Sequence, residues 1–170
     1  MPRVQTRYPS VTKFVGGVVF AVGLLSGLPA LAVCVPDAYP NNWLQLQENA
    51  GGHTIARHVG KTDAWLVNRY NGNYNISGAS TYASDATATQ HIQSALDIAQ
   101  GGYNAWEPNA NVGSRRAITT NLGYTVGRGV NAPTQRPADV QDVEDLDRLV
   151  TVIEKSGGGA CFLLTSYPTP

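Results

Sequence analysis

The sequence predicts an α+β domain in which N-terminal helices pack on an antiparallel sheet. Helical patterns come first along the chain, whereas segments rich in Thr, Tyr, Ile and Val come later and are interrupted by glycines. The last segments form a hairpin pattern, with two apolar runs joined by a glycine-rich turn. With 170 residues, 42% of them hydrophobic, the chain can form one domain with its own core.

Residues 1–32 have the pattern of a secretory signal peptide. Basic residues, an uncharged run and a small-residue cleavage motif follow one another: Arg3, Arg7 and Lys13, then residues 14–28, then Ala30-Leu31-Ala32. The glycine-rich run is shorter than the about 20 residues of a good membrane-spanning helix. We therefore expect cleavage after Ala32, a secreted or periplasmic location and no stable membrane insertion. The alternatives are an uncleaved anchor and a lipoprotein acylated on Cys34.

Charge is distributed unevenly along the chain. Loss of the leader would leave 9 basic and 12 acidic residues, so the mature chain as a whole is not a basic nucleic-acid binder. Residues 50–136 have seven basic and four acidic residues, whereas residues 137–155 have two and six. We expect the acidic run ADVQDVEDLDR, residues 138–148, to be a solvated loop or a face of a short helix.

Two cysteines, Cys34 and Cys161, remain after cleavage. In an oxidising compartment they either pair, tying the mature N-terminus to the last strand, or stay as free thiols. Neither has a histidine beside it in the sequence, which disfavours a cysteine nucleophile.

The first helices follow a short linker. Prolines and asparagines predict a linker over residues 33–49, which includes the start of the N-terminal helix, and the domain itself is expected over residues 50–170. Apolar residues at helical spacing predict a helix over residues 53–60 and a second one over residues 62–70, with Thr62 as its N-cap. The next segment, NGNYNISG, is typical of turns.

The longest predicted helix covers residues 85–99. Ser84 or Asp85 caps its start, and Gly101-Gly102 are expected to end it. Its apolar face consists of Ala88, Ile92, Ala95, Leu96 and Ala99.

Strands are predicted in the second half of the chain. Residues 117–130, AITTNLGYTVGRGV, have the composition of a strand interrupted by glycines. The closing hairpin joins residues 149–155 to residues 160–168 through a turn at residues 156–159.

Two of the three histidines, His53 and His58, lie five residues apart in one predicted helix. Zinc proteases space two helical histidines four apart, whereas five residues turn the two rings about 140° away from each other. A regular helix therefore cannot direct both at one ion, and no metal site is expected. We expect one histidine to face a functional site and the other to pack or to cap the helix. A serine triad is also disfavoured, since no G-x-S-x-G elbow is present.

A histidine with cationic partners suits phosphodiester cleavage without a metal. A neutral histidine can take the proton from an RNA 2′-hydroxyl, a cation can stabilise the phosphate oxygens, and an acid can protonate the leaving 5′-oxygen. RNA thus supplies its own nucleophile. The competing interpretation is that each histidine is an ordinary surface or core residue.

Three blocks of the sequence carry a family resemblance. GGHTIARHVGKTDAWLVNR, SDATATQHIQSAL and FLLTSYP resemble the bacterial RNase A-like domain that forms the C-terminal toxin of contact-dependent growth inhibition proteins and other polymorphic toxins. The resemblance implies a kidney-shaped, RNase A-like α+β fold and metal-independent RNA cleavage without a cofactor. It also implies, in many members, a cognate immunity protein that blocks the active site.

The resemblance assigns the activity to His58, Arg69, Thr165 and Tyr167. His58 would be the general base, Arg69 the phosphate clamp and Tyr167 a donor or acid near the leaving oxygen. Thr165 and Tyr167 are two apart in a predicted strand, so their side chains should project from one face.

Other polar residues are weaker candidates. His53 is a second acid or a residue of the helix start, and Lys61 is a phosphate contact or an ordinary exposed lysine. Candidate contacts to the RNA backbone are Arg57, Arg115 and Arg116. His91, in the longest helix, is expected to be a packed or surface residue.

The leading hypothesis is an exported, metal-independent endoribonuclease that acts through a 2′,3′-cyclic phosphate and serves as an antibacterial toxin. Its expected partners are RNA and a cognate immunity protein. A signal peptide on a short chain does not imply contact-dependent delivery, so a stand-alone secreted ribonuclease or another export route remains open. The alternatives are a secreted module that binds RNA or a protein without turnover, and an envelope protein whose histidine block is coincidental.

Overall fold

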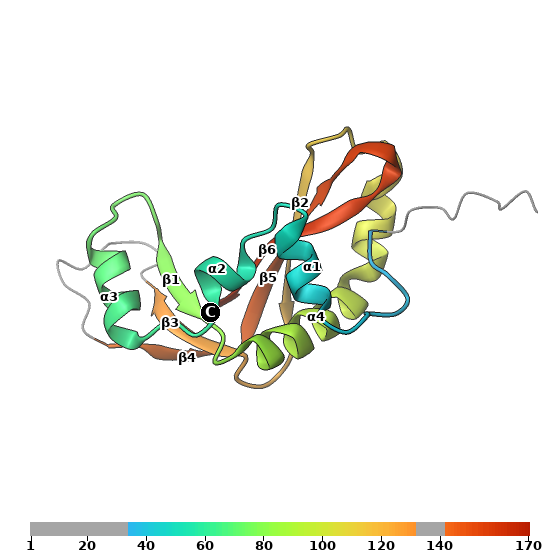
Figure 1. Ribbon diagram of the computed structural model, residues 1–170. Coiled ribbons are helices and arrows are strands. Elements are labelled where there is room, and N and C mark those ends of the chain that lie inside the picture. The colour runs from blue at the N-terminus through green and yellow to red at the C-terminus, as the bar shows by residue number, and fades with distance from the viewer. Residues whose placement is uncertain (1–33, 132–141) are drawn as a thin grey trace, which may run out of the picture. The chain divides into compact units, whose positions relative to one another are not determined.

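Helices and two antiparallel sheets make up the fold (Figure 1). The structure is a computed structural model, and it describes residues 34–131 and 142–170. Each sheet has three strands, in the orders β1-β3-β4 and β2-β5-β6. The predicted α+β class is therefore confirmed, with the strands divided between two sheets. The predicted signal peptide lies outside the described residues.

The helices largely precede the strands along the chain. They are α1 (Trp43–Asn49), α2 (Thr54–His58), α3 (Asp63–Asn71) and α4 (Asp85–Trp106), with short 3₁₀ turns at Glu107–Asn109 and Gly157–Gly159. The strands are β1 (Gly78–Thr81), β2 (Arg115–Asn121), β3 (Gly127–Asn131), β4 (Glu144–Leu146), β5 (Arg148–Lys155) and β6 (Cys161–Thr169). Strand β1 is an exception to this order, because it lies between α3 and α4.

The predicted starts of α3 and α4 are confirmed by their caps. Thr62 is the N-cap of α3, and its hydroxyl accepts a hydrogen bond from the N–H of Trp65 at 3.2 Å. Ser84 caps α4 through the N–H of Thr87, and the Thr87 hydroxyl accepts from the Ser84 N–H in return. Each cap satisfies a backbone donor that has no partner within the helix.

The predicted end of the longest helix is wrong, because α4 continues through Gly101-Gly102 to Trp106. A Cβ atom at Gly102 would lie 2.9 Å from Ile118 Cδ1 of β2, so the glycine lets the helix approach the sheet. Tyr103 follows it and is fully buried, with its hydroxyl bonded to β5. Tertiary packing of the last turns therefore outweighs the low helix propensity of two glycines.

The sheet β2-β5-β6 has two faces of different character. Residues that pair across antiparallel strands share a face. We call the face that packs against α4 the helix face; it carries Leu149, Thr151, Ile153, Leu163 and Ser166. We call the opposite one the site face; it carries Val150, Val152, Thr165 and Tyr167.

A β-bulge in β6 determines which residues reach the site face. Val152 pairs with Thr165 but Ile153 pairs with Leu163, so Leu164 is an extra residue. The extra residue reverses the alternation of side chains along the strand. Leu163 therefore lies in the core, whereas Thr165 and Tyr167 lie together on the site face.

The strand predictions are right for the hairpin and incomplete elsewhere. β5 and β6 pair in an antiparallel hairpin through the predicted turn. The predicted strand over residues 117–130 is two strands, β2 and β3, which belong to different sheets. Gly123, between them, has a φ of 77°, a value that favours glycine and allows the chain to turn there.

The expectation of a loop or short helix for the acidic run, residues 138–148, is wrong for four of its described residues, which lie in strands. Glu144–Leu146 form β4, which pairs with β3, and β5 begins at Arg148. The acidic side chains of β4 are exposed and its leucine is buried. Strand pairing therefore keeps the charges in water while it buries the apolar side chain.

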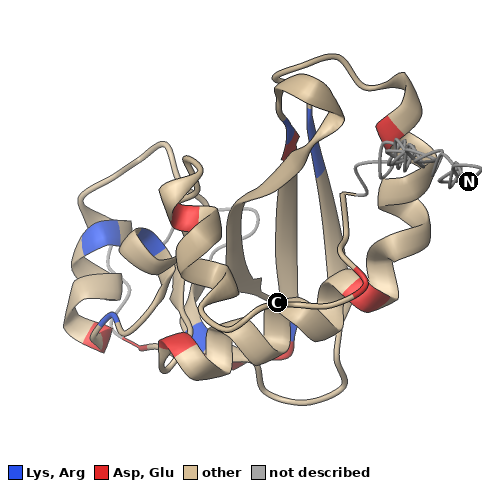
Figure 2. Ribbon diagram, turned by 45° about the vertical axis from the view of Figure 1, so that its right-hand side comes forward, with Lys and Arg blue, Asp and Glu red and all other residues tan. Residues whose placement is uncertain are grey.

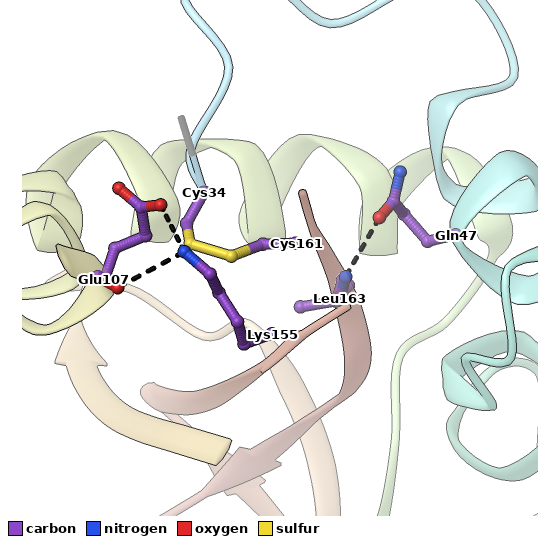
Figure 3. The surroundings of a disulfide bond; sticks show 6 residues. All are labelled: Cys34, Gln47, Glu107, Lys155, Cys161 and Leu163. Carbon is purple, nitrogen blue, oxygen red and sulfur yellow. Dashed lines mark hydrogen bonds and ion pairs between the residues drawn. A yellow bond between two sulfur atoms is a disulfide. The ribbon is translucent and has the colours of Figure 1, made fainter. Parts of the chain in front are cut away.

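Cys34 and Cys161 form a disulfide that ties the segment before α1 to the start of β6 (Figure 3). Cys34 and its neighbour Val35 are buried in the core, so this part of the expected linker is packed. Cys34 in this bond has no free thiol. Beside it, the largely buried Lys155 ammonium pairs with the Glu107 carboxylate. In the described part of the chain, no helix is both long and apolar enough to cross a membrane.

Candidate active site

The carboxyl end of α2 is fixed to β1, and this attachment positions His58. The carbonyl of His58, the last residue of α2, accepts a hydrogen bond from the N–H of Tyr82 at 2.8 Å. Gly60 then donates its N–H to the Tyr82 carbonyl at 2.9 Å. The φ of Gly60 is 66°, a backbone conformation that favours glycine, so the chain can leave the helix at once.

The amino end of α2 is fixed to β6 on the other side. His53 is the N-cap residue, and its N–H donates to the carbonyl of Leu164 in the bulge at 2.9 Å. The Thr54 hydroxyl accepts from the N–H of Ser166 at 2.9 Å. A Cβ atom at Gly52 would lie 2.6 Å from the Leu163 carbonyl, so only glycine allows this close approach. Helix α2 thus bridges β6 and β1.

The imidazole of His58 is held neutral with a defined tautomer. Its Nδ1 lies 3.3 Å from the carbonyl oxygen of Ser80, so Nδ1 carries the hydrogen and Nε2 has the free lone pair. Burial lowers the pKa of His58 to about 4, opposed by the Ser80 hydrogen bond and assisted by the nearby Arg69 cation. At neutral pH this histidine is therefore a proton acceptor.

Three of the four residues assigned by the resemblance line one cavity of about 290 Å³: His58, Arg69 and Tyr167. They come from α2, α3 and β6. The rings of His58 and Tyr167 are 5.2 Å apart between centroids, with an angle of 34° between their planes. Backbone and side chains of residues 75–80 line the same cavity. A neutral base, a guanidinium and a phenol thus meet in one space.

Thr165, the fourth residue, lies on the site face with Tyr167 but does not line the cavity. It is 9% exposed. Its hydroxyl oxygen has no hydrogen-bond partner among the described residues. Buried hydroxyl groups in folded proteins nearly always have a partner. The described residues therefore leave this hydroxyl without the partner that buried hydroxyls usually have.

Arg69, which lines the cavity, lies close to an aromatic ring. Its guanidinium carbon lies 5.2 Å from the ring centroid of Trp65, four residues earlier on α3. The ammonium of Lys61 lies 5.5 Å from the same ring. Lys61 therefore contacts the aromatic ring, although its backbone N–H is bonded to the Thr81 hydroxyl next to His58.

The remaining basic candidates are divided among different surfaces. His53 does not line the cavity, and burial, followed by the charge of Arg57, lowers its pKa. Arg115 pairs with Glu154 at 2.7 Å, and its position opposite that residue places it on the site face. Arg116 pairs with Ile153 in the register, so it lies on the helix face, away from Tyr167. Figure 2 shows basic residues on several elements with acidic residues among them.

Two residues of the site, Ser80 and Trp65, were not among the candidates predicted from the sequence. Ser80 orients the imidazole, but it is 22 residues from His58 and no local pattern reveals the contact. Trp65 stands four residues after Lys61 and four before Arg69, a spacing that the sequence does show.

His91 lies outside the site, half-buried, with its Nδ1 3.4 Å from the hydroxyl of Tyr124. Within residues 34–131 and 142–170, no three His, Cys, Asp or Glu side chains gather as metal ligands.

Comparisons with known proteins identify the family of this chain. Residues 52–168 match the family described as the bacterial CdiA-CT RNAse A domain. Among solved structures, the chain is similar to a CdiA-CT/CdiI complex from Y. kristensenii 33638, with 27% sequence identity and a TM-score of 0.58. That similarity covers 70% of this chain and 100% of the other. No curated protein matches the chain. The chain belongs to the bacterial CdiA-CT RNase A family of toxin domains.

Proposed function

We propose that this protein is an exported, metal-independent endoribonuclease that cleaves RNA by transphosphorylation. The observation that carries the proposal is the cavity in which the neutral imidazole of His58 meets Arg69 and Tyr167. Membership of a ribonuclease toxin family supports the reaction class. The cavity supplies a base, a cation and a hydroxyl donor, which are the groups that the reaction needs.

In the first step, Nε2 of His58 takes the proton of the 2′-hydroxyl. The 2′-oxygen attacks the adjacent phosphorus, the bond to the 5′-oxygen breaks, and a 2′,3′-cyclic phosphate forms. Arg69 stabilises the charge on the equatorial phosphate oxygens through its planar set of donors. The bound phosphate also raises the proton affinity of His58, because a nearby negative charge favours the imidazolium.

The leaving 5′-oxygen needs a proton. Tyr167 lines the cavity beside His58, whereas His53 does not, so we assign Tyr167 as the donor. Thr165 offers its unpaired hydroxyl to the same substrate from the site face. His53 then acts through its backbone, by fixing the start of α2 to β6.

The biological role follows from the family. The similar structure contains a CdiA-CT with a CdiI. We propose that this chain is likewise an antibacterial toxin with a cognate immunity protein that covers the cavity. Export through the N-terminal signal peptide is part of the proposal, because the disulfide requires an oxidising compartment.

The test is RNA cleavage by the purified, oxidised protein in EDTA. We expect the wild type to produce fragments with 2′,3′-cyclic phosphate ends. His58→Ala should abolish cleavage, and His91→Ala is the matched control, since His91 is a histidine outside the cavity. Loss of wild-type cleavage in EDTA would contradict the metal-independent reaction. Intact RNA in every sample, with RNA bound, would instead support a binding module.

A further inference from the structure

Trp65 is a partly exposed aromatic residue outside the buried face of α3. It lies on α3, where the buried side chains are those of Leu66 and Tyr70. The Trp65 ring is 37% exposed and lies near two cations, the Lys61 ammonium and the Arg69 guanidinium. Single exposed apolar side chains are common on protein surfaces, so it is the pair of cations beside this ring that points to a contact with a ligand.

The surface at Trp65 and the catalytic cavity share a lining residue, Arg69. A second, shallow hollow beside the ring is lined by Trp65, Asn68, Arg69, Gly72 and Asn73. Arg69 also lines the cavity that contains His58 and Tyr167. One residue, Arg69, therefore lines both spaces. A phosphate bound by Arg69 in the cavity would place the neighbouring nucleotide within reach of Trp65.

The chemistry of this surface fits a nucleobase joined to a phosphate. Aromatic side chains stack on any base, and cations next to them hold the backbone of single-stranded nucleic acid. The Lys61 ammonium ends a flexible four-carbon stem, so it can leave the ring for a phosphate when a base takes its place. Bases within a duplex are already stacked and cannot occupy such a platform.

We propose that Trp65 is the stacking platform for the nucleobase next to the scissile phosphate, and that the substrate is therefore single-stranded RNA. This inference rests on the proposed ribonuclease function and names its substrate class. Trp65 binds substrate, Lys61 contacts the phosphate beyond it, and Arg69 joins this subsite to the catalytic cavity.

The test removes the Trp65 ring and the base on which it stacks, separately and together, and measures kcat/KM in each case. The substrates are DNA oligonucleotides with a single ribonucleotide, so that only one bond can be cleaved. One substrate has all its bases, and two others each have one abasic sugar, either at the ribonucleotide or at the nucleotide after it. We expect one of these two abasic substitutions to lower the wild-type kcat/KM about 5- to 150-fold, the equivalent of one base stack. The same substitution should have no further effect in Trp65→Leu.

We call this dependence of the abasic effect on the Trp65 ring the coupling. It distinguishes stacking from an indirect role of Trp65 through Arg69. If Trp65 only positioned the guanidinium, Trp65→Leu would lower cleavage of intact and abasic substrates equally, and the proposal would be overturned. Trp65→Phe keeps an aromatic ring and should retain most of the coupling. Equal cleavage of both abasic substrates and the intact one by the wild type would overturn it as well.

A binding measurement keeps the inference testable even if the ribonuclease proposal fails. A single-stranded 2′-deoxyoligonucleotide should quench the tryptophan fluorescence of the wild type but not that of Trp65→Phe, which retains Trp43 and Trp106. A duplex of the same sequence should quench much less. Quenching that persists in Trp65→Phe, or that is equal for the duplex, would contradict the stacking platform. Absence of cleavage together with this quenching would contradict only the reaction.

Discussion

The buried hydroxyl groups on the two faces of the sheet β2-β5-β6 differ in their hydrogen bonding. On the helix face, the hydroxyl of Tyr103 from α4 bonds to the carbonyl and the hydroxyl of Thr151 at 2.7 and 2.6 Å. The Ser166 hydroxyl on that face bonds to the Val150 carbonyl and to the Tyr82 hydroxyl, each at 2.7 Å. On the site face, the buried hydroxyl of Thr165 has no partner among the described residues.

This difference separates polar groups that stabilise the fold from polar groups that serve a ligand. A buried hydroxyl with partners contributes to stability, and its loss leaves those partners unpaired. A buried hydroxyl without a partner costs free energy in the unliganded protein. The site face retains such a group beside a cavity with a neutral histidine, so we expect mutations on the two faces to have opposite consequences.

The largest effect is expected from a pair of tyrosines. Tyr167→Phe should lower RNA cleavage by about 10²–10⁴-fold, the range for a lost proton donor, with little change in stability. Tyr103→Phe removes a hydroxyl that is bonded on the helix face, so it should lower the free energy of unfolding by about 1–3 kcal/mol and leave cleavage unchanged. Denaturant unfolding and initial cleavage rates check both. Equal losses of activity in the two variants would contradict the division between the faces.

The largest effect on stability is expected from the disulfide. Cys161 lies opposite Lys155 in the register, and the bond closes a loop with a sequence separation of 127 residues. Its removal in Cys34→Ser/Cys161→Ser should lower the free energy of unfolding by about 2–5 kcal/mol.

The disulfide also tests whether the core and the site are separable. The cleavage rate per folded molecule should not change in the double variant, because neither cysteine lines the cavity. Urea unfolding and cleavage of single-stranded RNA should be measured on the same preparation. A selective loss of cleavage at full stability would show that this bond positions the site.

A pair of threonines gives the sharpest comparison, with a smaller effect. Thr151→Val leaves the Tyr103 hydroxyl with fewer partners on the helix face, and we expect a loss of about 1–3 kcal/mol in unfolding free energy. Thr165→Val removes a hydroxyl without a partner, so stability should stay the same or increase while cleavage decreases. The valine side chain has nearly the same shape in both cases. A destabilised Thr165→Val protein would mean that this hydroxyl has a structural partner in solution.

Local patterns predicted the elements whose determinants are local. Thr62 and Ser84 start helices through hydrogen bonds to residues three positions away, and the closing hairpin is a short-range structure. The end of α4 was not predictable in this way, because its last turns pack on the sheet, where Gly102 leaves room for Ile118 and Tyr103 bonds to β5. The same holds for β4, whose strand character comes from its pairing with β3.

The site was predictable only through the resemblance. The spacing of Thr165 and Tyr167 correctly implied a common face, but the bulge at Leu164 decides which face that is. Arg115 and Arg116 were both candidate contacts to the RNA backbone, but alternation along β2 places the two residues on opposite faces. Contacts over long sequence separations, such as that between Ser80 and His58, appear only when the chain is folded.

The last prediction concerns the pH dependence that His58 gives to stability. Burial lowers the pKa of this folded-state imidazole to about 4, below the about 6.5 of an exposed histidine, so the unfolded chain binds more protons between these values. The stability associated with His58 is therefore complete above about pH 6.5 and is lost as the pH falls toward 4. Between pH 7 and pH 5 we expect a decrease of about 1–2 kcal/mol in the unfolding free energy.

His58→Gln removes this titration, so its stability should decrease less over the same pH range. His91→Gln is the control, because it removes an imidazole outside the cavity and should keep most of the wild-type pH dependence. NMR titration provides a direct measurement, in which the His58 ring of the wild type should stay neutral down to about pH 5. Protonation of that ring near pH 6.5 would mean that the imidazole is exposed to water. The cavity next to the site face would then lack the neutral base that the proposed reaction needs.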